Sequence, residues 1–135
     1  AAAEATLRTN VLPEIEREVS AGVDTLKRHG VRNDGLFRAP HGLKSPFLPR
    51  VLKKVGLRAI AWTDGVWDTD RPGVDVIAAR SVKRLRPGEI LLLHDGGDGA
   101  DRSQTAAALE PILVYCKNRG LACVTIPELL DGGAK

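Results

Sequence analysis

Short apolar runs alternate with longer helix-like segments along the 135 residues, and this order limits the possible folds. An amphipathic helix is predicted to start at Pro13 and stop at Gly30, because Pro in a first turn and Gly after a last turn are typical helix boundaries. Four strand-like runs follow, at 35–37, 57–62, 89–93 and 121–125. Each run leads into a helix-like segment, and this order favours an α/β fold with about four parallel strands joined by crossover helices.

Composition and charge place the chain among ordinary globular proteins. It is 43% hydrophobic and 27% charged, and its length predicts a single domain over 1–135, with 1–12 poorly ordered or linking. No apolar run is long enough to span a membrane, so no membrane partner is predicted. The basic residues fall on two helix-like segments without interleaved aromatic residues, so we interpret them as solvated faces and expect no nucleic-acid partner. Cys116 and Cys123 lack a metal-ligand spacing and are interpreted as buried free thiols.

Polar side chains stand where the predicted strands end. Arg38 ends the first strand, 62–68 follow the second, and His94 with Asp95 follows the third. Because the carboxyl ends of parallel strands share one edge, these side chains are expected to gather there. The set consists of Arg38, Trp62, Asp64 or Asp68, Trp67 and His94. A histidine beside a carboxylate can act as general acid or base, and the alternative is a structural histidine whose ring nitrogens are satisfied.

Three segments resemble the motifs of a known family. They are "FRAPHG" (37–42), "AWTDGVWDTDRPG" (61–73) and "RPGEILLLHDG" (86–96). In this order they resemble the third, fourth and fifth motifs of the polysaccharide deacetylases of carbohydrate esterase family 4, and the resemblance runs from about 14 to 130. It implies the C-terminal half of an irregular, TIM-like (β/α) barrel that lacks its N-terminal strands. It also implies a hydrolase that removes acetyl groups from chitin-like, peptidoglycan-like or related polymers with a divalent metal, usually zinc.

The resemblance assigns roles to individual residues. His94 matches the histidine that protonates the leaving amine, Arg38 matches the arginine that orients the base aspartate, and Asp68 is the best match for the aspartate beside the histidine. Substrate-binding positions are matched by Trp62, Trp67, Leu92, His41 and Asp64. Asp64 and Trp67 remain alternatives to Asp68 and Trp62, and His41 stands where the family more often has tyrosine.

The family's first two motifs, which carry the catalytic base and the metal ligands, are absent. The three histidines are His29, His41 and His94, and no two are four residues apart, so no metal-ligand set is predicted in this chain. A missing N-terminal half or a second copy would have to complete the barrel, since four strands leave two open edges. Two functions follow: the general-acid side and groove of a metal-dependent deacetylase, or a non-catalytic carbohydrate-binding or assembly module that has lost the metal. The compartment is not predicted.

Overall fold

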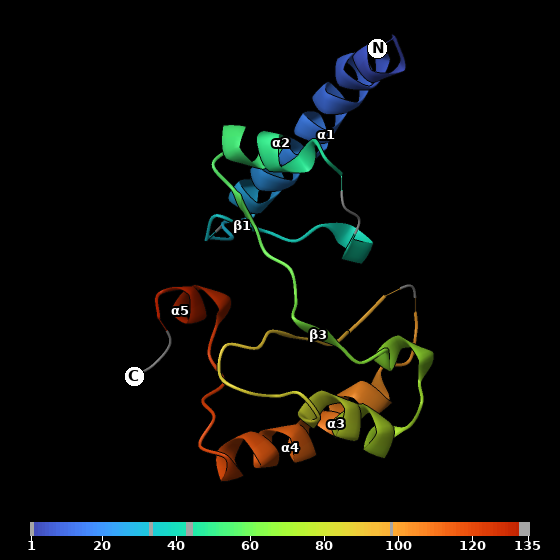
Figure 1. The fold of residues 1–135 in the computed structure, drawn as a ribbon, viewed down its shortest axis with the longest axis vertical. Coiled ribbons are helices and arrows are strands. Elements are labelled where there is room, and N and C mark those ends of the chain that lie inside the picture. The colour runs from blue at the N-terminus through green and yellow to red at the C-terminus, as the bar shows by residue number, and fades with distance from the viewer. Residues whose placement is uncertain (1, 33, 43–44, 98, 133–135) are drawn as a thin grey trace. The chain divides into compact units, whose positions relative to one another are not determined.

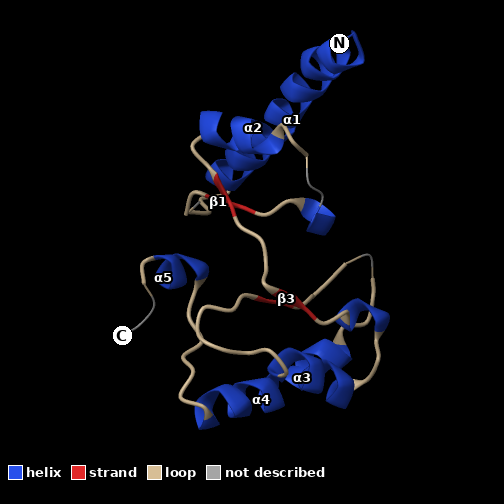
Figure 2. Ribbon diagram, viewed as in Figure 1, coloured by secondary structure: helices blue, strands red, loops and turns tan. Residues whose placement is uncertain are grey.

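The computed structural model describes residues 2–32, 34–42, 45–97 and 99–132, with side chains described from Val11 onward except that of His41. The chain divides into two compact units, 1–61 and 62–135, and each is described by itself. Figure 1 follows both units along the chain, and Figure 2 separates their helices from short strands and long loops. None of the helices in the described ranges is long and apolar enough to cross a membrane.

The first unit is built on the long helix α1 (Ala2–Arg28), against which α2 (Leu48–Lys54) packs (Figure 1). Val19 of α1 is buried with Val51 and Leu52 of α2. The Lys54 ammonium also contacts the Glu16 carboxylate at 2.6 Å. The amphipathic character predicted for this helix is therefore confirmed at Val19.

Helix α1 differs from the prediction at its N-terminal end. It begins at Ala2, so Pro13 lies inside the helix and not in its first turn, and the backbone of residues 2–12 is helical. Alanine is the strongest helix former, and the alanine-rich start of the chain explains the extension. The C-terminal end is as predicted: Gly30 adopts φ +68° and Val31 N–H bonds the Leu26 carbonyl, which is a glycine-terminated helix end.

Strands β1 (Leu36–Phe37) and β2 (Arg58–Ala59) form a parallel pair in the first unit. The ladder is flanked by hydrogen bonds from Arg58 N–H to the Gly35 carbonyl and from Ile60 N–H to the Phe37 carbonyl, both 2.8 Å. The predicted strand at 57–62 is thus shorter in the structure.

Strands β3 (Asp64–Gly65) and β4 (Leu91–Leu92) form a second parallel pair, with Asp64 opposite Leu91 and Gly65 opposite Leu92. Strand β3 falls in a segment predicted as a loop. Asp and Gly are poor strand formers, so the pairing is decided by tertiary contacts. One of these is Thr63, whose N–H donates to the Ile90 carbonyl at 2.9 Å and whose hydroxyl accepts from Ile90 N–H at 2.8 Å.

Helices α3 (Val74–Val82) and α4 (Ser103–Asn118) pack side by side in the second unit (Figure 1). Their contact forms a core that β4 and the loops close from one side. The buried members of this core are Val66, Ile77, Ala108, Ile112 and Cys116. Pro111 lies within α4 and does not divide it. The last helix, α5 (Ile126–Leu130), starts with a capping box between Thr125 and Glu128, as its Thr-Ile-Pro-Glu sequence favours.

Two predictions for the C-terminal region are wrong, namely the strand at 121–125 and the buried thiol of Cys123. Residues 121–125 form no strand in the described structure, because the helix-ending turn carries the chain away from α4 and leaves Ala122 and Cys123 exposed rather than packed in a sheet. The expected four-stranded sheet is therefore two separate parallel pairs in the described residues. For the same reason only Cys116 is a buried thiol, whereas Cys123 is exposed.

Candidate active site

The parallel pair β3–β4 brings two predicted site residues together. Asp68 opens the short 3₁₀ turn η2 (Asp68–Asp70) just after β3, and His94 follows β4. The ladder partners Gly65 and Leu92 lie shortly before these two residues, so both side chains start from the same, carboxyl end of the pair. This is the edge at which α/β folds usually place reactive groups.

His94 and Asp68 are joined by two hydrogen bonds. The His94 backbone N–H donates to Asp68 Oδ2 at 2.9 Å, and the ring atom His94 Nδ1 lies 2.9 Å from Asp68 Oδ1. Thr105 adds a third, from its hydroxyl to Asp68 Oδ2 at 2.9 Å. Asp68 is only 1% exposed, whereas the His94 side chain is 41% exposed. A buried, fully partnered carboxylate therefore stands behind an accessible imidazole.

The charge state of Asp68 follows from these contacts. Burial by itself raises the pKa of a carboxyl group, but the hydrogen bonds from the His94 ring, the His94 backbone N–H and Thr105 together outweigh it and hold the Asp68 pKa below its ordinary value of 3.8. Asp68 is thus ionised near neutral pH and can only accept hydrogen bonds. His94 Nδ1 must then carry a proton, which leaves Nε2 as the ring atom that can take or give one.

The turn after Asp68 is fastened to the start of α4. Arg71 pairs with Asp101 at 3.1 Å, and Gly73 N–H donates to the Gln104 side-chain oxygen at 2.8 Å. The Arg102 guanidinium also reaches the Thr69 carbonyl at 3.4 Å. These contacts hold the Asp68 turn against the helix that supplies Thr105.

The other aromatic and acidic candidates of the second unit surround the strand pair in different ways. Trp62 is partly buried, and its indole Nε1 lies 3.3 Å from where a Cβ on Gly65 would stand. Trp67 directly precedes Asp68, is 71% exposed and adopts a left-handed φ of +55°. Asp64 and Leu92 are ladder residues. Of the two aspartates left open by the sequence, Asp68 is the one that bonds His94.

Two candidates belong to the first unit. Arg38 follows β1 and is exposed, as expected for a strand-end residue, and its place beside the Asp68–His94 pair stays a prediction. His41 falls in the 3₁₀ turn Pro40–Gly42, and its side chain lies outside the described residues.

A divalent metal does not fit the side chains that the structure describes. Among them, no three histidine, cysteine, aspartate or glutamate groups lie close enough to hold an ion. The Asp68 carboxylate would be the best-placed metal ligand among them, but its oxygens already accept three hydrogen bonds. The described residues therefore provide proton-transfer groups and no metal centre.

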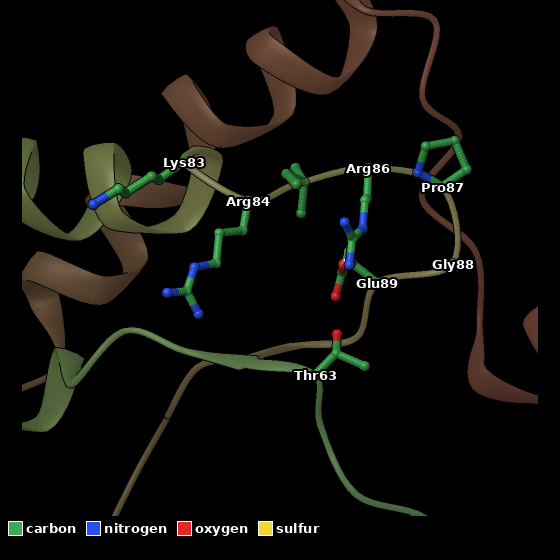
Figure 3. Close-up of a pocket in the computed structure, with 8 residues that line it drawn as sticks. Thr63, Lys83, Arg84, Arg86, Pro87, Gly88 and Glu89 are labelled. Atoms are coloured by element: carbon green, nitrogen blue, oxygen red, sulfur yellow. The ribbon is translucent and has the colours of Figure 1, made fainter.

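A basic cavity of about 800 Å³ lies at the opposite, amino end of β3 and β4 (Figure 3). It is lined by Thr63 and by residues 83–89. In Figure 3 the Arg86 and Glu89 side chains point toward each other, and their ion pair measures 2.7 Å. A hydrogen bond with Thr63, followed by the contacts with Arg86, lowers the Glu89 pKa. This cavity contains none of the predicted site residues.

Thr105 is the site residue that the sequence analysis missed. It lies on the buried stripe of α4 with Ala108, Ile112 and Cys116, at the three- and four-residue spacing of one helix face. A hydroxyl on an otherwise apolar stripe needs a buried acceptor, and that pattern is the signal that could have identified it.

Comparisons with known proteins agree with the motif resemblance, although no family model matches the chain. A peptidoglycan-N-acetylglucosamine deacetylase of Bacillus cereus is 40% identical over 105 residues, which is 74% of this chain and 47% of that protein. A chitooligosaccharide deacetylase of Sinorhizobium fredii is 34% identical over 100 residues, 68% of this chain and 46% of that protein. The chain thus spans about half the length of the curated relatives it matches.

Solved structures give the same relationship. A family 4 carbohydrate esterase from Streptomyces lividans, in complex with acetate, superposes with a TM-score of 0.75 at 27% identity, over 85% of this chain and 57% of that one. A mutant of a Bacillus anthracis pseudoenzyme of the family, with restored enzymatic activity, gives 0.81 at 25% identity over 92% of this chain and 43% of that one. Ordered motifs, sequence identity and fold together show that the chain belongs to carbohydrate esterase family 4, the polysaccharide deacetylases.

Proposed function

We propose that this chain supplies the proton-donor side of a hydrolytic deacetylation of N-acetylated polysaccharides or oligosaccharides of the chitin or peptidoglycan type. The observation that carries the proposal is the Asp68–His94 pair, with a buried carboxylate on Nδ1 and a half-exposed ring. The substrate class comes from the deacetylases that the chain resembles.

In the proposed reaction, water adds to the carbonyl carbon of the acetyl group. The amide carbon–nitrogen bond then breaks, giving acetate and a free amine. An amine leaves poorly as an anion, so its nitrogen must gain a proton as the bond breaks. His94 in its charged form donates that proton from Nε2, while Asp68 keeps Nδ1–H in place and stabilises the imidazolium. Positioned acid catalysis of this kind contributes about 10²- to 10⁴-fold to the rate.

The base that activates water, and the divalent metal that the family resemblance implies, are assigned to no described residue. The family resemblance implies that both lie in the first two motifs, which this chain lacks. We propose that the complete activity requires those motifs, and that Arg38 acts together with them.

A chimera tests this proposal. This chain would replace the matching segment of the Bacillus cereus relative, and acetate release from an N-acetylglucosamine oligosaccharide would be measured with zinc present. The expected result is turnover that falls at least about 100-fold in the His94→Ala variant. His29→Ala, at the exposed end of α1, is the matched control and should leave the rate unchanged. A folded chimera that turns over equally with and without His94 would overturn the acid role.

A non-catalytic carbohydrate-binding or assembly module is the second candidate. Two observations favour it: the likeness to a pseudoenzyme of the family, and the 71% exposure of Trp67, since an exposed indole can stack on a sugar face. Titration calorimetry of the chain with chitooligosaccharides in EDTA distinguishes the two functions. Metal-independent binding that Trp67→Ala abolishes, with an inactive chimera, supports this candidate. Absence of binding counts against it.

A further inference from the structure

Thr105 makes a buried contact whose role goes beyond packing. It stands in the first turn of α4, is 5% exposed and donates its hydroxyl hydrogen to Asp68 Oδ2 at 2.9 Å. We propose that Thr105 is a positioning residue that fixes the Asp68 carboxylate and, through it, the His94 ring. The structural part of this inference stands alone, and only its catalytic consequence rests on the proposed function.

Three hydrogen bonds surround the Asp68 carboxylate. Two of its three hydrogen bonds come from His94, one from the backbone and one from the ring. These bonds hold Asp68 and His94 to each other but do not fix the pair to the rest of the unit. The third bond comes from Thr105, on a helix whose next buried residues, Ala108 and Ile112, belong to the core. Thr105 therefore anchors the pair to the buried core of the second unit.

The carboxylate needs such an anchor because its last torsion is soft. The Asp χ2 angle has broad, roughly two-fold preferences and no strong staggered wells. The Thr105 hydroxyl and the His94 backbone N–H both donate to Asp68 Oδ2. These two bonds fix the plane of the carboxylate so that Asp68 Oδ1 faces His94 Nδ1. Without the hydroxyl, Oδ2 keeps one donor and the carboxylate can rock, which loosens the ring hydrogen bond.

The position of Thr105 adds an electrostatic effect. The first turn of a helix carries unsatisfied N–H groups and a partial positive charge, which favours an anion nearby. Thr105 places the ionised Asp68 beside this turn, and the Arg71–Asp101 and Gly73–Gln104 contacts hold the same two segments together. Positioning and charge stabilisation thus act in the same direction.

Three variants separate positioning from packing. Thr105→Val keeps the branched shape and removes the donor, and Thr105→Ser keeps the donor and removes a methyl group. Ser81→Ala is the matched control, because Ser81 is fully buried and donates its hydroxyl to the Ile77 carbonyl within α3, without a contact to Asp68. All three would be examined in the 135-residue chain with ¹⁵N-labelled histidine, and a His94→Gln variant would assign the ring signals.

The measured quantity is the solvent exchange rate of the His94 Nδ1 proton. In the native chain this proton should be observed and slow to exchange. Thr105→Val should speed its exchange roughly tenfold, the scale of one hydrogen bond to a charged group, while Thr105→Ser and Ser81→Ala should stay close to the native rate. Native exchange in Thr105→Val, or equally fast exchange in Thr105→Ser, would overturn the proposal.

A second measurement covers a Thr105→Val variant that fails to fold. The Thr105 hydroxyl proton of the native chain should be protected from exchange, in contrast to that of the exposed Ser103. Equal exchange at the two hydroxyls would overturn the proposal without any variant. Both measurements are independent of turnover, so a failed deacetylase assay with a protected Nδ1 proton would reject the proposed function and leave the positioning role intact.

Discussion

His94 and Asp68 contact each other through both the backbone and the side chain of the histidine, at 2.9 Å in each case. This double contact sets the ring orientation and the ring tautomer at once. It arises because β3 and β4 are parallel neighbours, so that the residues that follow each strand emerge at the same edge. The effects of this pair on the ring tautomer and on stability can be measured with the 135-residue chain.

Replacing Asp68 by Asn should reverse the protonation of the His94 ring. The Asn side-chain nitrogen can donate to Nδ1, which then becomes an acceptor and leaves the proton on Nε2. Two-bond ¹⁵N–¹H spectra of labelled histidine would show the change from the Nδ1-protonated to the Nε2-protonated tautomer. The variant should also lose about 1–3 kcal/mol in the free energy of unfolding, because a buried group loses charge-assisted hydrogen bonds. An unchanged tautomer would contradict the assigned contact.

Asp68 should contribute to the acid dependence of the free energy of unfolding. Its pKa is lowered on folding, so its contribution is complete above its unfolded value of 3.8 and disappears as the pH falls through the lower folded value. The difference in the free energy of unfolding between the native chain and Asp68→Asn, measured by urea denaturation, should shrink as the pH falls from about 4 to about 2. A difference that stays the same over this range would show that the native carboxyl is not ionised.

The two cysteines should differ in reactivity. Burial, and then the neighbouring Cys123 thiol, raises the pKa of Cys116, and its side chain is buried, whereas Cys123 is exposed. Because the thiolate is the reactive form, iodoacetamide at pH 7.5 should label Cys123 at least about tenfold faster. Peptide mass spectrometry would measure both rates, and labelling in urea should equalise them. Equal rates in the folded chain would argue against the α4 packing described here.

The α3–α4 contact should be the main source of stability in the second unit. Ile77 is completely buried there, and Ile77→Ala should lower the free energy of unfolding by about 2–5 kcal/mol through lost burial and the cavity left behind. The adjacent Val76, 38% exposed on the same helix, provides the control: Val76→Ala should change it by less than about 1 kcal/mol. Thermal or urea unfolding followed by circular dichroism checks both values, and similar losses would contradict the packing.

Much of this organisation could be predicted from local sequence signals. Helices α1, α2 and α4 end just before Gly30, Gly56 and Gly120, and α5 follows the Thr125 capping box. The strand-end rule placed His94 beside an aspartate, but could not choose between Asp64 and Asp68, because that choice depends on where the β3–β4 pairing ends. The run at 121–125 has the composition of a strand but forms none in the described structure. A short apolar run forms a strand only where the backbone of a partner strand is available. Thr105 was not predicted as a site residue, because its hydrogen-bond acceptor, Asp68, lies 37 residues away in the sequence.

Each of the three donors to the Asp68 carboxylate comes from residues 62–135, the second compact unit. The hydrogen bonds that hold the His94 ring are thus assembled within one compact unit. Such an arrangement can persist in a relative that no longer turns over substrate, so a well-ordered histidine alone is a poor guide to whether a relative is active.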